Sequence, residues 1–250
     1  MRSFNSTRRL PGALALLTTG LLLIFGSIAQ AHFVWLDLGG TKAKPVGMYF
    51  GEATISDSAS LLDHVKQTEL YGRDSEGNYH RLTMEKQVDG QLGHWVAGPE
   101  QKDAEASWKV LEAVCDYGVL AKGDAPFQLW YHAKYANKEA LSQPALLRSE
   151  KLGLDVIPTL TDDQLQLEVR AGGKPVADAE VVISDEADKA TTLQTDAKGL
   201  VTLAQPEMIR YHIRARHIDP VAGEREGKKY DSIRHYSTLV LDLGDAKAAQ

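Results

Sequence analysis

The chain has 250 residues, of which 43% are hydrophobic and 25% charged, and its formal net charge is −6. This composition excludes wholesale disorder, collagen and a coiled coil, and the acidic balance argues against a nucleic-acid partner, which needs a basic surface. The single cysteine, Cys115, excludes an internal disulfide and any multi-cysteine metal site. Its apolar-rich neighbours favour a buried small hydrophobe over a reactive thiol.

The first 31 residues have the three-part layout of a secretory signal peptide. Three arginines within residues 1–9 precede an almost wholly apolar run over 13–28, and residues 29–31 supply the small side chains that a signal peptidase reads. The apolar run is short for a membrane-spanning helix and ends in this cleavage motif. We therefore expect cleavage after residue 31, a periplasmic location and a new first residue, His32.

The mature chain is strand-like almost throughout, because short runs of β-branched and aromatic residues alternate with Gly, Asp, Asn and Pro. Residues 57–68 are the exception and favour a helix or an irregular turn, with apolar side chains along one side. Residues 139–151 show no strand alternation and predict a linker or a short helix. In the first half the predicted strands are 32–38, 46–50, 70–72, 94–97, a run ending near 120, and 126–131.

The second half is more regular, and strict polar–apolar alternation over Gln164–Val169 has the period of a half-buried strand. Further strands are predicted over 179–183, 200–203, 211–217 and 236–243. Short strands at this spacing are typical of a β-sandwich. The sequence thus predicts an all-β protein with two β-sandwich domains, over residues 32–138 and 152–250, joined by the linker 139–151.

Part of the second half resembles a known small domain. Gly173–Val181, followed by Thr195–Gly199 and Tyr211–Ile213, is similar to the transthyretin-like or carboxypeptidase-regulatory-like sandwich. This resemblance implies an immunoglobulin/transthyretin-like fold for residues 152–250 and says nothing of function.

A second resemblance spans nearly the whole mature chain. Its motifs resemble a bacterial domain-of-unknown-function family of exported periplasmic proteins associated with cobalt or nickel transport. The resemblance implies nickel or cobalt as the ligand and leaves a membrane metal transporter open as a partner. Its motifs are specific for the family and weak for any reaction. They are Ala31–Leu36, Tyr117–Val119, Tyr131–Lys134, Gly227–Asp231 and Arg234–Leu239.

All eight histidines lie in the mature chain, and His32 has the strongest case as a metal ligand. Cleavage would give it a free α-amine beside its ring, and the two nitrogens can close a six-membered chelate. A metal displaces the proton of an α-amine readily near neutral pH. One further histidine would give three nitrogens in a plane, which suits Cu(II) or Ni(II). The alternative is that His32 frays in solvent.

His217 and His235 come next, by a geometric argument. His217 shares the parity of the apolar residues in 211–217, and His235 shares that of Leu239 and Leu241. If the two strands pair as an antiparallel hairpin, both rings face the same side at the mouth of the connecting loop. Alternatively, both are half-buried residues that hold the loop. The loop is long and carries acidic and phenolic side chains that could bind or support a metal, namely Asp219, Glu224, Glu226, Tyr230 and Asp231.

The other histidines are less informative. His132 has the opposite parity to its apolar neighbours, so we expect a surface residue, with a place as a third ligand left open. His64, His80 and His94 have turn-like or polar surroundings and are predicted to be exposed. The sequence shows neither a nucleophile-elbow serine nor a phosphate-binding glycine loop.

These features favour a non-enzymatic periplasmic protein that binds nickel, cobalt or copper for uptake or delivery, with His32, His217 and His235 as ligands. Two alternatives remain open. An amino-terminal histidine on a β-sandwich also resembles copper polysaccharide monooxygenases, which would make the protein a histidine-brace oxidoreductase. The other is an adhesion or carbohydrate-binding module in which the histidines are incidental.

Overall fold

The described part of the chain consists mostly of β-strands with a few short helices, which confirms the predicted all-β class. The computed structural model describes residues 32–41, 44–99, 108–121, 125–161, 164–184, 190–204 and 209–244, so the predicted signal peptide lies outside the described residues. The strands of the first half are β1 Phe33–Thr41, β2 Lys44–Gly51, β3 Asp57–Ser58, β4 Glu69–Arg73, β5 Tyr79–Asp89, β6 Leu92–Pro99, β7 Val110–Leu120 and β8 Phe127–Asn137. Those of the second half are β9 Leu154–Leu160, β10 Gln164–Ala171, β11 Lys174–Pro175, β12 Glu180–Ser184, β13 Ala190–Gln194, β14 Leu200–Ala204, β15 Arg210–Asp219, β16 Gly223–Arg225, β17 Lys228–Tyr230 and β18 Ser232–Asp242.

The helices are short and lie where the strand pattern fails. The 3₁₀ helix η1 spans Ala59–Val65, within the segment predicted as a helix or turn, and buries Leu62 and Val65. Helices α1, Lys138–Leu141, and α2, Pro144–Leu147, occupy the predicted linker. None of the helices in the described part of the chain is long and apolar enough to cross a membrane.

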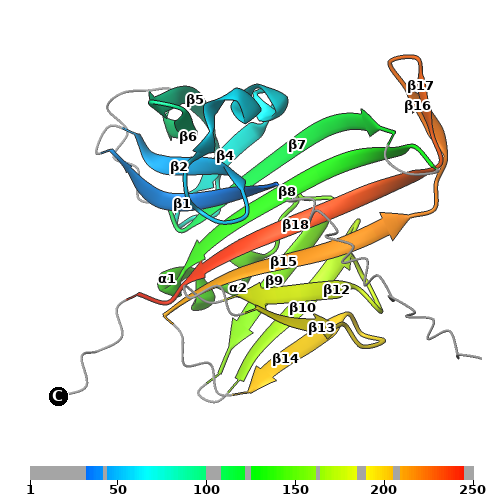
Figure 1. Ribbon diagram of the computed structural model, residues 1–250. Coiled ribbons are helices and arrows are strands. Elements are labelled where there is room, and N and C mark those ends of the chain that lie inside the picture. Colours follow the sequence, from blue (N-terminus) through cyan, green and yellow to red (C-terminus); the bar gives the residue numbers. More distant parts are fainter. Residues whose placement is uncertain are drawn as a thin grey trace, which may run out of the picture. The chain divides into compact units, whose positions relative to one another are not determined.

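One large sheet runs through both halves of the sequence. Its strand order is β1-β2-β6-β5-β4-β7-β8-β18-β15-β12-β13, with β3 paired to β6. The last strand, β18, pairs in parallel with β8 along its whole length, whereas the other pairs in this sheet are antiparallel. The described residues form one compact unit. Figure 1 shows β8, β18 and β15 as long neighbouring arrows at its centre.

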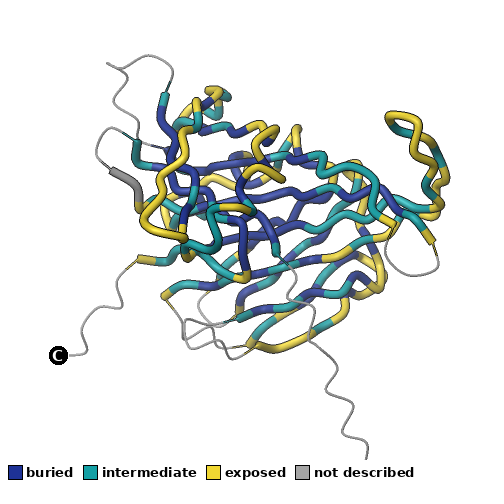
Figure 2. The backbone as a smooth tube through the Cα atoms, turned by 45° about the horizontal axis from the view of Figure 1, so that its top comes forward, coloured by how far each residue is buried: buried dark blue, intermediate teal, exposed yellow. Residues whose placement is uncertain are grey.

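The strands β8 and β18 are covered on both faces by hydrophobic cores. On one face, Tyr131 and Val240 pack with Phe33 and other residues of β1 and β2 in a first core. On the opposite face, Leu239 packs with Leu167 of the second sheet, formed by β9, β10, β11 and β14, in a second core. Dark blue, buried segments therefore run through the middle of Figure 2. Polar side chains that point from β8 or β18 toward the second sheet are consequently withdrawn from water.

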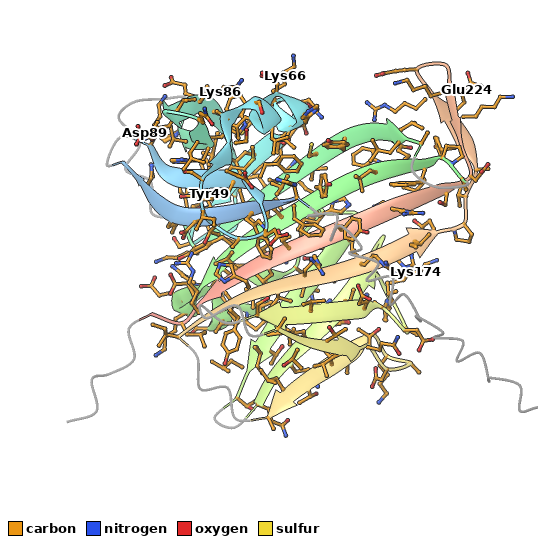
Figure 3. All side chains as sticks on the ribbon, viewed as in Figure 1. Tyr49, Lys66, Lys86, Asp89, Lys174 and Glu224 are labelled. Carbon is orange, nitrogen blue, oxygen red and sulfur yellow. The ribbon has the colours of Figure 1, made fainter. Side chains whose placement is uncertain are left out.

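The predicted hairpin between the last two histidine-bearing strands is confirmed. β15 and β18 pair in antiparallel fashion from Arg210↔Asp242 to Asp219↔Ile233. The connection between them contains a second, small hairpin made of β16 and β17. This small hairpin projects beyond the sheet in Figure 1, and Glu224, labelled in Figure 3, lies exposed on it.

Candidate metal-binding site

Two histidines face each other at the loop end of the β15–β18 hairpin. His217 in β15 lies directly opposite His235 in β18, with ring centroids 6.4 Å apart and ring planes 23° from parallel. Ile213, which shares the parity of His217, is buried in the second core. His212 points to the other face, where its ring contacts Trp35. The parity argument therefore assigned both histidine rings to the correct side of the sheet.

Both rings meet a single carboxylate, that of Asp219. The His217 Nε2 atom is 2.7 Å from Asp219 Oδ1, and the His235 Nε2 atom is 3.2 Å from Asp219 Oδ2. Asp219 follows His217 by two residues in the same strand, so the two side chains share a face. The side chains of His217, His235 and Asp219 are 23%, 14% and 39% exposed, and an ion in solution can therefore reach them.

A third histidine, His132 of β8, stands behind this pair. Its Nε2 atom is 3.1 Å from His235 Nδ1, with ring centroids 5.3 Å apart and ring planes 20° from parallel. The residue is 2% exposed, so the expectation of a surface position is wrong. The expectation failed because it assumed that one face of β8 meets solvent, whereas β8 is a central strand buried on both faces. The aromatic-rich sequence of β8 was the signal in the sequence that indicated a strand buried on both faces.

The surroundings of His132 leave its ring little freedom. A Cβ atom added to Gly153 would lie 3.1 Å from His132 Cε1 and 4.0 Å from His235 Cε1, so a larger residue at this position would press on the His132 ring. On the other side, the ring plane of Trp130 is within 5° of that of His132. The His132 Nδ1 atom is buried and has no hydrogen-bond partner among the described residues.

The electrostatics favour neutral rings in the inner two histidines. Burial, with a smaller contribution from His235, lowers the pKa of His132 to about 3. Burial also lowers the pKa of His235, although the Asp219 carboxylate opposes that shift. A neutral imidazole has one N–H donor and one nitrogen lone pair, and the lone pair is what binds a metal.

His32 lies apart from this cluster. Its Nε2 atom is 3.2 Å from Asp57 Oδ2, and its ring centroid is 5.4 Å from that of Phe50. Phe50 belongs to the first core, on the face of β8 that carries Tyr131, whereas His132 points to the opposite face. The structure thus brings together two of the three predicted ligands, His217 and His235, and separates the third.

Of the remaining histidines, two are exposed as expected, whereas the expectation that His94 is exposed is wrong. His64 and His80 are exposed. His94 is half-buried: its Nδ1 atom lies 2.9 Å from Ser56 Oγ, and its ring stacks on Tyr49 with centroids 4.9 Å apart. Cys115 is buried, as its apolar neighbours predicted, and burial raises the pKa of its thiol to about 11.

Within the described ranges, no group of three or more His, Cys, Asp or Glu side chains is arranged as it stands to hold a metal ion. In the histidine cluster, the two Nε2 atoms are directed at different oxygens of the same carboxylate. An ionised carboxylate only accepts hydrogen bonds, so a proton lies on each Nε2 atom where a metal would bind. Metal binding would have to displace those two hydrogen bonds.

Comparisons with known proteins add little. No family model matches the chain, and no curated protein sequence matches it. Among solved structures it is similar to the pullulanase type I from Bacillus subtilis str. 168 complexed with maltose, at 12% identity and a TM-score of 0.19 over 81% of this chain and 24% of that chain. The BSP domain of a biofilm-associated protein gives 10% identity and a TM-score of 0.21 over 80% and 27% of the two chains.

A 1.5-MDa bacterial ice-binding adhesin gives 9% identity and a TM-score of 0.21 over 86% of this chain and 66% of that chain. The chain therefore spans about a quarter of the length of the first two structures that it resembles. Likenesses at this TM-score carry no argument about this protein.

Proposed function

We propose that this protein binds a divalent transition metal in the periplasm, for uptake or for delivery, and that His217, His235 and Asp219 are its ligands. The observation that carries the proposal is the cross-strand pair of imidazoles sharing one accessible carboxylate. Imidazole nitrogens combined with a carboxylate oxygen suit nickel, cobalt, copper or zinc better than magnesium or calcium.

The two strands support a binding role because they fix the ligands without covering them. The strand register fixes which residues lie opposite each other, so the backbone separation of the two histidines does not depend on a loop. The site lies where the strands end, beside the long connection that carries further acidic side chains. The family resemblance favours nickel or cobalt within this set, and a membrane metal transporter would be a suitable recipient.

Titration calorimetry with Ni(II), Co(II) and Cu(II) on the mature protein tests this proposal. We expect His217→Ala and His235→Ala each to lower the affinity for the bound ion by about a hundredfold or more. His80→Ala is a matched control, because His80 Nε2 is 2.8 Å from Asp74 Oδ2 and so forms an exposed histidine–carboxylate pair of its own. The proposal fails if the wild-type protein binds none of these ions, or if the two site variants bind as tightly as the control.

His32 enters the proposal as a separate site. We propose that cleavage after residue 31 frees its α-amine, which chelates a metal together with Nδ1 while Asp57 holds Nε2 on the other side of the ring. The mass of the exported protein fixes its first residue. A second binding event that disappears when a methionine precedes His32 would support this site, and an unchanged isotherm would exclude it.

The proposed two-sandwich architecture has the support of the two separate cores, although strands of both predicted domains pair within one sheet.

Of the competing functions, a copper oxidoreductase is distinguished by oxygen-dependent peroxide production from the copper-loaded protein. Absence of binding to every ion tested would favour a non-catalytic adhesion or carbohydrate-binding module.

A further inference from the structure

The hydrogen bonds around Asp219 assign a proton to each ring of the cluster. Because an ionised carboxylate has no donor, His217 and His235 both present Nε2–H to Asp219. A neutral His235 ring protonated at Nε2 carries a lone pair at Nδ1. The atom facing that lone pair is His132 Nε2, 3.1 Å away, which therefore donates the hydrogen bond. His132 Nδ1 is then left with a lone pair.

We propose that His132 is a positioning residue that sets the tautomer of His235, and that metal binding reverses the hydrogen bond between these two rings. The inference rests on the proposed function. A metal at His235 Nε2 requires the lone pair there, so the ring must carry its proton at Nδ1. That proton needs an acceptor, and His132 Nε2 is the atom in place to accept it.

The exchange balances without a net gain or loss of protons. The Nε2 proton of His132 passes to Nδ1 of His235 across the hydrogen bond between them. His235 Nε2 releases its proton to solvent when the metal binds, and His132 takes up one proton from solvent at Nδ1. Each ring has one proton before and after the exchange, so neither ring changes its charge. This matters because burial disfavours a charged imidazole at position 132.

The structure holds the two rings in a suitable arrangement for this exchange. The His132 Nε2 and His235 Nδ1 atoms are within hydrogen-bond distance of each other, at 3.1 Å, so a proton can lie on either nitrogen of the pair. Gly153, which precedes β9, lies beside the His132 ring and limits its movement on that side. His132 thus acts on the metal only through His235.

The unpartnered Nδ1 atom of His132 suits a group that must change tautomer. A carbonyl oxygen beside it would hold the proton at Nδ1, and an N–H donor would hold the lone pair there. Among the described residues it has no partner of either kind. Neither tautomer of His132 is therefore favoured at this end, and the occupant of the Asp219 site decides between them.

Two variants of similar volume separate this role from simple packing. Gln at position 132 offers an amide that can donate to or accept from His235, whereas Leu can do neither. We expect His132→Leu to weaken Ni(II) binding in titration calorimetry by about 10- to 100-fold, and His132→Gln to stay within about threefold of the wild-type protein. Gly153→Ala, which removes no imidazole, is expected to weaken binding by an intermediate amount by pushing on the pair. Thermal unfolding of each variant confirms that the compared proteins are folded.

Nitrogen-15 NMR of the histidine rings reads the tautomers directly. We expect His235 to be protonated at Nε2 in the metal-free protein and at Nδ1 with Zn(II), used as a diamagnetic ion, with His132 changing in the same sense. A His132 ring that keeps its Nε2 proton when the metal is bound overturns the inference. So does equal affinity of His132→Leu and His132→Gln.

Failure of the inference can be distinguished from failure of the proposed function. If the wild-type protein binds metal and His217→Ala does not, while both position-132 variants bind equally well, only the tautomer exchange is wrong. If His217→Ala binds like the wild-type protein, the ligand assignment itself is wrong, whatever the position-132 variants do.

Discussion

The strand β8 carries two buried polar side chains, His132 and Lys134, two residues apart on the same face, and they differ in how well they are paired. Lys134 Nζ donates to the carbonyl oxygens of Leu147, at 2.6 Å, and Val156, at 3.2 Å, and pairs with the Asp155 carboxylate. His132 has one partnered and one unpartnered nitrogen. Lys134 is 1% exposed and His132 is 2% exposed, so burial alone does not distinguish them.

The neighbours of Lys134 extend this complete pairing into a buried ionic cluster, which consists of Arg73, Glu112, Lys134 and Asp155. Glu112 is fully buried and accepts a hydrogen bond from Ser149 Oγ, while Arg73 Nη1 donates to the carbonyl oxygen of Leu146 at 2.6 Å. These contacts tie the α2–β9 segment to the large sheet. A cluster in which every charge has partners stabilises the fold, whereas one that leaves a nitrogen free keeps a lone pair available for chemistry.

Breaking the buried ionic cluster should have the largest effect. Lys134→Met leaves the Asp155 carboxylate buried without its cation, and we expect the free energy of unfolding to fall by about 3–5 kcal/mol in urea titrations. Adding Asp155→Leu to Lys134→Met removes the stranded charge and should recover most of that loss. A cost below about 1 kcal/mol for Lys134→Met would show that the pair contributes little, and the contrast with His132 would then disappear.

Removing the charge of Asp219 should have the opposite pattern, with a large effect on the affinity for the metal and a small effect on the free energy of unfolding. We expect Asp219→Asn to lower the affinity for the bound ion by about a hundredfold, because the amide offers one weaker oxygen in place of a carboxylate. The free energy of unfolding should change by less than about 1 kcal/mol, since the side chain is 39% exposed. Asp231→Asn, an exposed aspartate of the same connection, is the matched control in calorimetry. Equal affinities of the two variants would remove Asp219 from the ligand set.

Much of this arrangement followed from local pattern. Residue parity predicted that His217 and His235 share a face if the strands pair, and in the β15–β18 pairing the two residues lie directly opposite each other. The loop acids were recognised as candidates, and Asp219 is the one that contacts the rings because it continues the strand parity of His217. Glu224 lies instead on the small hairpin, which the sequence pattern did not predict.

The long-range pairing could not be predicted in the same way. The parallel alignment of β18 with β8 joins residues about a hundred positions apart, and alternation within one strand carries no information about its distant neighbour. This pairing places His132 beside His235. His32 lies instead beside Phe50 of the first core, on the opposite face of β8. The sequence pattern therefore predicted which residues lie together within one hairpin, but not which residues lie together across the sheet.

The contrast between Lys134, which is fully paired, and His132, which is not, also predicts that the stability of the metal-free protein depends on pH. The pKa of His132 is lowered to about 3 in the folded state, against about 6.5 in an unfolded chain. Between these values the unfolded state binds a proton that the folded state does not, so stability falls as pH falls. We expect His132 to contribute a loss of about 1 kcal/mol per pH unit below about pH 6. Urea unfolding at pH 7 and pH 5 should show a smaller loss for His132→Gln, and an identical loss would mean that His132 is not held neutral.

The smallest effect is expected for His32→Ala on the His217–His235 site. His32 contacts Phe50 and Asp57 on the side of β8 that faces the first core. His132 and the His217–His235 pair lie on the side that faces the second sheet, so β8 separates His32 from the pair. Calorimetry with Ni(II) on a protein that retains a methionine before position 32 isolates this site from any amino-terminal chelate. There His32→Ala should leave the affinity within about twofold, because a ligand on the opposite face can neither reach the ion nor change the hydrogen bonds of Asp219. A tenfold loss would require His32 to reach the pair, and the separation of the two faces, with the comparison built on it, would then be wrong.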